Sequence, residues 1–274
     1  MVRLLMDVPE SKRLPVYGLE FVPVCVIQYS LEGSFFIMIF ENKYRVGIED
    51  VDRDNLITSK AILRMFEDMA CFHAASLGHD PISVVEMGFA WVLANWQIKI
   101  LKRCVYGTTL NVKTWPKKFE KITTLRDYEI TDESGDVVAI GTSRWFIIDI
   151  KTRRPIRISE EYAKPYLPLT ENDAIEKMDK IEEPEEYKYK KEYIVCRRDI
   201  DSNMHMHNIN YLDVALEIIP EEVFENNKFD EISIEYKKEL MYKDKVDCYY
   251  CEKNGKNIVM MKTDDKVNAI ISLS

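Results

Sequence analysis

An internal repeat constrains the fold of this 274-residue chain more than any other feature. Asp50-Val51-Asp52 recurs 149 positions later as Asp199-Ile200-Asp201, and IKILKR at 98–103 recurs 136 positions later as IEYKKE at 234–239. The matches come in the same order, and the difference between the offsets corresponds to an insertion near residues 79–90. Together they indicate a duplicated unit that runs through a strand, a DxD turn, a helix and about four antiparallel strands.

Hydrophobic spacing places the elements of both copies. Apolar residues at three- and four-residue steps predict a helix over 59–77, closed by Gly78, and Asn208 is expected to cap a second helix that ends before Pro220. Strands are expected from Met38 onward and over 88–104, 107–116, 120–132, 137–150, 230–241, 245–253, 256–263 and 266–273. Asn254-Gly255 predicts a hairpin between two of these strands.

The composition changes between the two copies. Residues 159–190 are rich in Glu, Lys, Pro and Tyr and are expected to form a surface linker. The N-terminal unit is therefore expected over 38–158 and the C-terminal unit over 191–274, with 1–37 as an extension of undetermined role. The fold class is α+β, with two antiparallel sheets.

The copies differ in their polar residues. Asn203 and His205 align with Asp54 and Leu56, and Glu239 aligns with Arg103, so polar chemistry is expected only in the second copy. It precedes a helix N-terminus, whose unpaired N–H groups and positive dipole suit an anionic intermediate. The alternative is a capped turn with spare polar residues, and Glu239 taken alone resembles a solvated strand charge.

Composition narrows the partners and the compartment. A net charge of −9 argues against a nucleic-acid-binding surface, and residues 1–37 are too short and too weakly basic for a helix-turn-helix. No run reaches the roughly 18 apolar residues that span a membrane, and no signal peptide is evident. Cys248 and Cys251 form a CxxC pattern, but on a strand they would point to opposite faces. All six cysteines are thus expected to be reduced in a cytoplasmic protein, with no metal and no cofactor.

The chain resembles the fatty acyl-[acyl-carrier-protein] thioesterases of plants and bacteria over about 38–274. The motifs that carry the resemblance are R-x-x-D-x-N-x-H-x-x-N-x-x-Y at 198–211, Leu-Glu and Ile-Pro at 216–220, IEYKKEL at 234–240, WVLANWQIKI at 91–100 and SRWFIIDIKTRRPIRI at 143–158. The resemblance implies a double hotdog, in which each of two tandem units wraps an antiparallel sheet around a helix. It also implies hydrolysis of the thioester between a fatty acid and the acyl carrier protein, which becomes the expected partner.

Carried over residue by residue, the family's catalytic positions fall on Asp201, Asn203, His205 and Glu239. We hypothesise that Asn203 and the helix N–H groups polarise the carbonyl, and that Glu239 with His205 deprotonates water. Asp201 either positions its neighbours or attacks directly to give an anhydride. His207 stands where many plant members have Asn, and Leu240 where many have Cys, which excludes a cysteine nucleophile at that position.

The resemblance also gives the first helix a role. Core side chains there are expected to line an acyl tunnel, namely Ile62, Met65, Phe66 and Met69. An acidic carrier protein would dock on basic residues, for which the candidates are Lys99, Lys102, Arg103, Lys117, Lys118, Arg153, Arg154 and Arg157, although a scattered solvated face is an alternative. An acyl-CoA thioesterase and a non-catalytic acyl-binding module stay open as functions, and a monomer or a homodimer as the assembly.

Overall fold

The computed structural model describes residues 24–29, 36–166, 168–169 and 173–274. The chain forms two compact units: unit 1 comprises residues 1–92 and 102–176, and unit 2 comprises 93–101 and 177–274. Much of the expected N-terminal extension, residues 1–23 and 30–35, lies outside the described residues. The expected unit boundaries at 38, 158 and 191 stay predictions.

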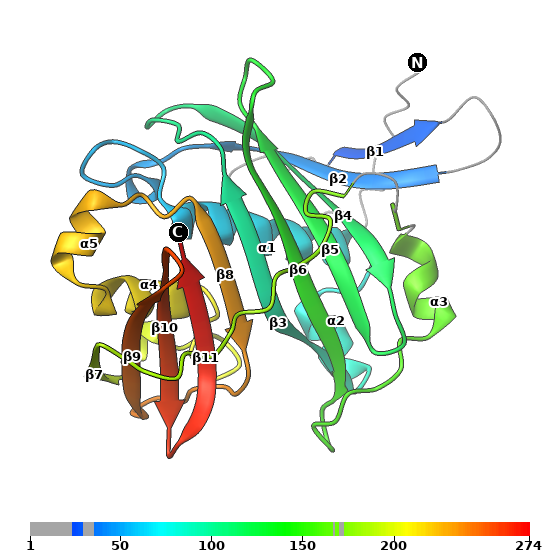
Figure 1. Cartoon of the computed structure of the whole chain (residues 1–274). Coiled ribbons are helices and arrows are strands. Elements are labelled where there is room, and N and C mark those ends of the chain that lie inside the picture. The colour runs from blue at the N-terminus through cyan, green and yellow to red at the C-terminus, as the bar shows by residue number, and fades with distance from the viewer. Residues whose placement is uncertain (1–23, 30–35, 167, 170–172) are drawn as a thin grey trace. The chain divides into compact units, whose positions relative to one another are not determined.

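Unit 1 is an antiparallel sheet with one long helix against a face (Figure 1). Neighbouring strands follow the order β1 (Val24–Tyr29), β2 (Phe36–Arg45), β4 (Thr109–Phe119), β5 (Thr123–Thr131) and β6 (Val137–Asp149). The helix is α1 (Ser59–Ser76), and its N-cap is Thr58, whose hydroxyl accepts a hydrogen bond from the N–H of Ala61. The shorter helices of unit 1 are η2 (Ile48–Asp50), α2 (Pro81–Glu86), α3 (Glu160–Ala163) and η3 (Lys164–Tyr166).

The apolar stripe of α1 forms the core of unit 1. Phe66 stacks on Tyr128 of β5, with ring centroids 4.8 Å apart. Leu110 and Val112 of β4 are fully buried with them. The apolar spacing over 59–77 predicts a helix with one face packed against alternating strand positions. The helix α1 confirms this prediction.

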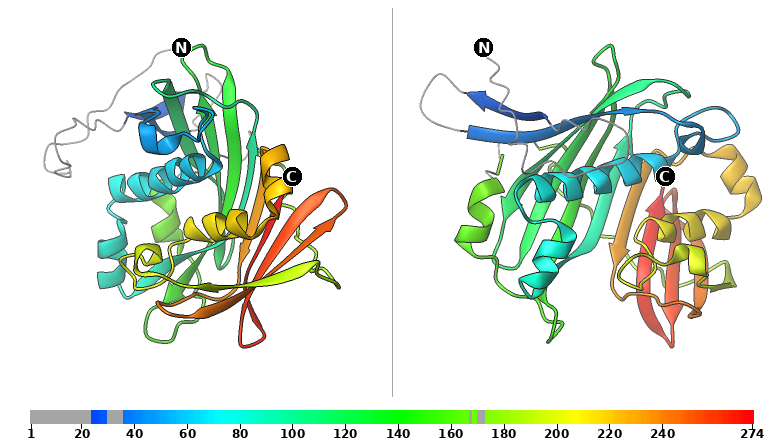
Figure 2. Two further views of the ribbon diagram at one scale, coloured as in Figure 1. Left: turned by 90° about the vertical axis from the view of Figure 1, so that its left-hand side faces the viewer. Right: turned by 180° about the vertical axis from the view of Figure 1, so that it is seen from behind.

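From β7 onward, the chain repeats the element order that starts at β2, as the sequence repeat predicts. The elements are β7 (Tyr189–Ile194), η4 (Arg197–Asp199), α4 (Asn210–Ile218), α5 (Glu221–Asn226), β8 (Glu231–Tyr236), β9 (Lys245–Lys253), β10 (Lys256–Thr263) and β11 (Lys266–Leu273). The antiparallel sheet of unit 2 has the order β3, β8, β11, β10, β9, β7, in which β3 (Phe89–Ile100) pairs with β8 through Asn95–Lys99. The helix α4 lies against one face of this sheet and packs on β9 and β11 (Figure 2).

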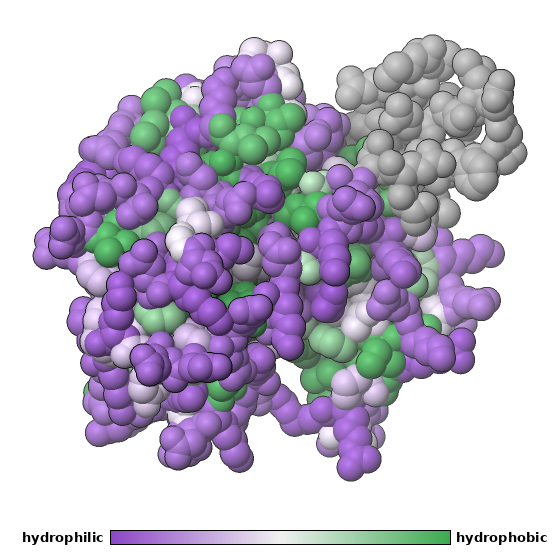
Figure 3. Space-filling model, in the orientation of Figure 1, coloured by the Kyte–Doolittle hydropathy of each residue, from purple (hydrophilic) through white to green (hydrophobic). Residues whose placement is uncertain are grey.

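The other face of the unit 2 sheet is covered by the segment 177–188, which we call the strap. It crosses the strands in Figure 1, and Ile181 and Tyr187 pack there against an apolar cluster that includes Met260 and Ile270. The N–H of Ile181 also donates to Glu235 Oε1 at 3.1 Å. The surface seen from this side is mainly hydrophilic, with small apolar patches between (Figure 3).

Most expected elements of unit 2 are confirmed, and the strands over 245–253, 256–263 and 266–273 have the expected bounds. Asn254 and Gly255 both take positive φ, 53° and 74°, in the β9–β10 hairpin, as their sequence predicts. The short helices α2 and α5 were not expected. The strand expected over 230–241 ends at Tyr236.

The expected helix cap at Asn208 is wrong. The helix α4 starts at Asn210, its N-cap is Ile209, and no side chain caps it. The carbonyl of Asn208 instead accepts a hydrogen bond from the Tyr236 hydroxyl at 2.8 Å, and Asn210 Nδ2 donates to the carbonyl of Asp199 at 3.1 Å. These bonds hold the residues before α4 in a turn.

None of the helices in the described ranges combines the length and the apolar character that a membrane span requires.

Candidate active site

The loop that carries Asn203 and His205 is folded around the carboxylate of Asp201. One oxygen of this carboxylate accepts from the N–H groups of Asn203 at 2.8 Å and His205 at 3.2 Å. In unit 1, Asp52 accepts in the same way from Asp54 at 2.9 Å and Leu56 at 3.0 Å. An Asp side chain that satisfies backbone donors two and four residues on is a local turn-forming device. The loop is therefore built identically in a copy that has the polar residues and in one that lacks them.

A second carboxylate anchors the start of each loop. Asp199 is buried, and its Oδ2 accepts from the Cys196 N–H and from the Tyr193 hydroxyl, both at 2.7 Å. Asp50 takes the matching position in unit 1, where its Oδ2 accepts from the Gly47 N–H at 2.8 Å. Both aspartates of the DxD turn thus accept hydrogen bonds that hold the loop in each unit.

Backbone hydrogen bonds join this loop to the segment that follows β8. His205 forms an isolated antiparallel bridge with Met241, and the Met206 N–H donates to the Leu240 carbonyl at 2.7 Å. In unit 1, Leu56 bridges Val105, and the Ile57 N–H donates to the Cys104 carbonyl at 2.8 Å. Both pairs obey the sequence offsets of 149 and 136, so the repeat confirmed by element order also holds at individual hydrogen bonds.

The four predicted catalytic residues therefore meet on two adjoining backbone segments of unit 2. Asp201 and His205 are partly buried, whereas Asn203 and Glu239 are exposed. Glu239 directly precedes Leu240, and His205 directly precedes Met206, so the Met206–Leu240 bond brings their backbones together. A carboxylate and an imidazole held this way beside the start of α4 have the chemistry needed to activate water. Their individual roles stay predictions.

The matching position of Glu239 in unit 1 is Arg103, and its guanidinium has a structural use. It donates to the Ile57 carbonyl at 2.9 Å and to Ser59 Oγ at 3.1 Å. Unit 1 thus has a cation bonded to its own backbone where unit 2 has an exposed acid. Only the second copy therefore has a carboxylate at this position.

Three residues whose side chains hold the backbone around the candidate site were not among the site residues predicted from the sequence. Tyr211 accepts from the Leu240 N–H at 3.1 Å, and Asn210 and Tyr236 make the turn contacts before α4. Their matches in the first copy of the repeat are Ile62, Ala61 and Ile100. A comparison of the copies at these three positions would have singled them out, because polar residues there replace apolar ones.

The residues expected to line an acyl tunnel lie in the core of unit 1. Ile62, Met65, Phe66 and Met69 have no exposed surface. Their lining role stays a prediction.

A polar group lies buried on the same helix. His73 Nδ1 contacts Arg126 Nη1 at 2.9 Å, and since arginine only donates, the histidine proton is on Nε2. Arg126 also donates to Thr114 Oγ1 at 3.2 Å. Burial, with Arg126 adding to it, lowers the pKa of His73 well below its usual value, so this imidazole is neutral.

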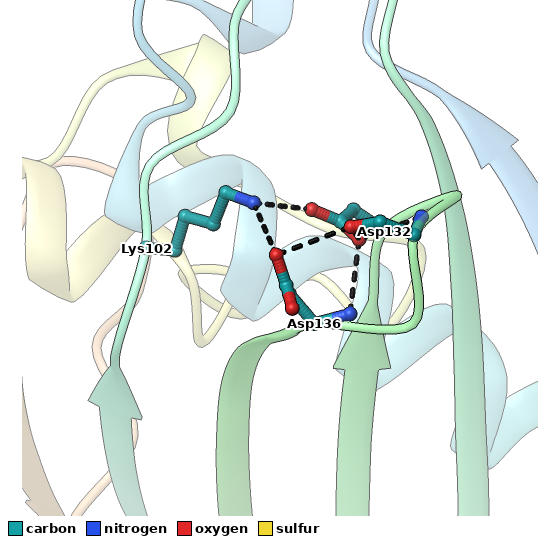
Figure 4. Close-up of polar contacts among 4 residues, drawn as sticks. Lys102, Asp132 and Asp136 are labelled. Atoms are coloured by element: carbon teal, nitrogen blue, oxygen red, sulfur yellow. Dashed lines mark hydrogen bonds and ion pairs between the residues drawn. The ribbon is translucent and has the colours of Figure 1, made fainter.

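Most basic residues of the expected docking patch are bonded within their own unit. Lys102 Nζ bridges Asp132 at 2.5 Å and Asp136 at 3.0 Å in the β5–β6 turn (Figure 4). Buried Lys117 donates to the Ile175 carbonyl at 2.7 Å. Ion pairs are also formed by Lys99 with Glu231 and by Lys118 with Glu120. The exposed Arg154 and Arg157 are the better candidates for docking.

The cysteines follow the strand geometry expected of them. Cys248 pairs with Met261 and Cys251 with Ile258, so the two point to opposite faces of the sheet, and both are free thiols. Burial raises the pKa of the Cys248 thiol to about 12. Across the described part of the chain, no three His, Cys, Asp or Glu side chains gather to hold a metal ion.

Comparisons with known proteins identify the family to which the chain is similar. Residues 38–166 match the family model described as the acyl-ACP thioesterase N-terminal domain, and residues 179–271 match that of the C-terminal domain. The chain is 27% identical over 226 residues to the oleoyl-acyl carrier protein thioesterase 1, chloroplastic, of Arabidopsis thaliana, which covers 76% of the chain and 62% of that relative. The chain thus spans less than two thirds of the length of this relative.

Solved structures support the fold. An acyl-ACP thioesterase from Bacteroides thetaiotaomicron superposes with a TM-score of 0.78 at 21% identity, covering 86% of this chain and 96% of that one. The 12:0-ACP thioesterase from Umbellularia californica gives a TM-score of 0.78 at 17% identity with the same coverage. At these identities the likeness establishes the fold, two tandem hotdog units of α+β class.

Proposed function

The chain belongs to the acyl-ACP thioesterase family, and on that premise we propose that it hydrolyses the thioester of a fatty acyl-[acyl carrier protein]. The reaction releases a free fatty acid and ends chain elongation in fatty acid biosynthesis. The observation that carries the proposal is the backbone link between the His205 and Glu239 segments. The imidazole and the carboxylate thus belong to adjoining backbone segments, and only the second copy of the repeat has both residues.

Water is the nucleophile in the mechanism that these residues support. Glu239, together with His205, takes a proton from water as its oxygen bonds to the thioester carbon, and the carbonyl electron pair moves onto oxygen. Asn203 and the N–H groups at the start of α4 stabilise that oxyanion. Collapse of the intermediate breaks the C–S bond. The leaving thiolate, whose parent thiol has a pKa of about 8.5, takes up the proton with little need of acid assistance.

We assign Asp201 a positioning role. One of its carboxylate oxygens is already occupied by two backbone N–H groups, and Asp52 makes the same two bonds in unit 1, where the other catalytic positions are lost. Because Asp52 holds its loop in unit 1 without the other three residues, the same loop-holding role is sufficient to account for Asp201 in unit 2. This favours positioning over attack on the thioester.

The partner is the acyl carrier protein with its acylated phosphopantetheine arm. Exposed Arg154 and Arg157 provide positive charge for an acidic partner. Five cysteines of the described residues are free thiols, which fits a cytoplasmic setting, whereas the plant relatives are named as chloroplastic proteins. A monomer or a homodimer fits this function equally.

The test is thiol release from carrier-protein thioesters of eight to eighteen carbons, with the matching CoA thioesters beside them. Wild type should turn over the carrier-bound substrates faster. His205→Ala and Glu239→Ala should each lose at least about 100-fold in kcat while keeping their thermal unfolding midpoints. Preference for CoA thioesters would make the protein an acyl-CoA thioesterase. Tight binding without turnover by a folded wild type would make it an acyl-binding module.

A further inference from the structure

Tyr211 has a buried hydroxyl that contacts the backbone beside the proposed catalytic acid. The side chain is 2% exposed, and its oxygen accepts from the Leu240 N–H at 3.1 Å. Its ring also packs edge-on against Tyr236, with centroids 5.3 Å apart. A backbone N–H in so buried a place has no water to bond to, and losing its partner is costly. The tyrosine therefore fixes where this stretch of backbone lies.

Leu240 is held from both sides. Its N–H donates to Tyr211, and its carbonyl accepts from the Met206 N–H at 2.7 Å. Its two chain neighbours are Glu239, the proposed acid–base group, and Met241, which bridges His205. A shift of Leu240 would thus move Glu239 and His205 with respect to each other.

Comparison of the two copies shows that the Tyr211–Leu240 contact is not part of the backbone arrangement that they share. The Met206–Leu240 bond has its counterpart in the Ile57–Cys104 bond of unit 1, but the position of Tyr211 is taken there by Ile62, which has no hydroxyl. Tyr211 therefore follows the pattern of Asn203, His205 and Glu239: it is present only in the copy with the site.

We propose that Tyr211 is a positioning residue of the active site, whose hydroxyl holds the Leu240 N–H and so sets the place of Glu239 relative to His205. The inference rests on the proposed function and deepens it. The electrostatics fit the role. Burial raises the pKa of Tyr211, and the negative charges of Glu239, Asp244 and Asp201 raise it further, so the hydroxyl stays neutral at every working pH. A neutral hydroxyl anchors the backbone and adds no charge beside the carboxylates.

The test compares Tyr211→Phe with Tyr250→Phe. Tyr250 is also fully buried and donates to Asn257 Oδ1 at 2.8 Å on the sheet, so both variants lose one buried hydroxyl bond. Tyr211→Phe should lower kcat by about 10- to 100-fold at unchanged KM, since small misplacements of reacting groups cost rates of this size. Tyr250→Phe should keep both constants within about twofold, and both variants should lose similar thermal stability.

A Tyr211→Phe enzyme with wild-type kcat, or one that changes only KM, would overturn the inference and leave the thioesterase proposal intact. An inactive wild type would instead overturn the thioesterase proposal. Amide exchange in wild type tests the contact itself, even where Tyr211→Phe does not fold. A Leu240 amide that exchanges as slowly as the core of β8 supports the contact, and one that exchanges as fast as an exposed turn contradicts it.

Discussion

The carboxylate of Asp201 holds the loop that carries Asn203 and His205. It bonds two N–H groups within four residues, and Asp52 does the same in unit 1. The loop between contains one residue with positive φ in each unit, Met204 at 65° and Asn55 at 61°. Met204 holds a conformation that costs a non-glycine residue roughly 1 kcal/mol, and the two Asp bonds offset this cost.

We expect Asp201→Asn to retain activity within about tenfold of wild type, because the amide oxygen can still accept both N–H bonds. Asp201→Ala should lose at least about 100-fold in kcat, because the loop that carries Asn203 and His205 is released. Thiol release from one carrier-bound substrate measures both variants. Equal, near-complete loss in Asp201→Asn and Asp201→Ala would show that Asp201 attacks the thioester itself.

Asp52→Ala is the matched control for these variants. It removes the same pair of bonds from unit 1 and should destabilise the protein by about 1–2 kcal/mol, as Asp201→Ala does, while kcat stays near wild type.

At the scale of an element, the turn after the bridged segment is the same in both units but uses different residues. Gly107 has φ 84° and donates to the Val46 carbonyl at 2.9 Å, whereas Lys243 has φ 72° and donates to the Val195 carbonyl at 3.0 Å. The turn requires a left-handed backbone conformation. Glycine adopts it without strain in unit 1, whereas the lysine in unit 2 is strained by its Cβ. The turn in unit 2 lies just beyond Glu239 and Met241.

Gly107→Ala should lower the free energy of unfolding by about 1 kcal/mol, and Lys243→Gly should raise it by about 0.5 kcal/mol. No atom lies within 4 Å of a Cβ built on Gly107, so the first cost is one of backbone conformation alone. Urea unfolding measures both. Destabilisation by both substitutions would mean that the lysine side chain contributes more than its backbone strain costs.

Element by element, the sequence predicts the molecule where its pattern is long. The helix over 59–77 and the strands near the C-terminus follow from periodicity and turn chemistry, and the two offsets predict individual hydrogen bonds. The short α2 and α5 escape such prediction, because six residues give too few turns for a period to show. The expected N-cap of α4 is one residue early, since the Tyr236–Asn208 contact joins residues 28 positions apart.

At the scale of the whole molecule, the buried histidine of unit 1 makes stability depend on pH. His73 is neutral in the fold because burial lowers its pKa, whereas in the unfolded chain it binds a proton below about pH 6.5. The unfolded state therefore binds more protons as acid is added, and stability is full above this pH and falls below it. The slope contributed by one such group is at most about 1.4 kcal/mol per pH unit.

His73→Phe should flatten that fall. The new ring keeps the stack on Phe40, while Arg126 loses an acceptor, so the variant starts less stable at pH 7.5 and loses less between pH 6.5 and 5.5. Burial also lowers the pKa of His79, so some slope remains. Urea unfolding at the three pH values gives the comparison, and parallel curves for wild type and variant would contradict the assignment.

The pairing of β3 with β8 has a consequence for how the protein is made. Asn95 pairs with Glu235, a separation of 140 positions, and the other strands of unit 2 all come from 189–273. During synthesis the β3 segment leaves the ribosome long before its partner, with one row of backbone groups unpaired and a large loop still to close. Such distant pairings form slowly. The loop that carries Asn203 and His205 is bonded to Leu240 and Met241, just after β8, so it is completed only after these residues have emerged.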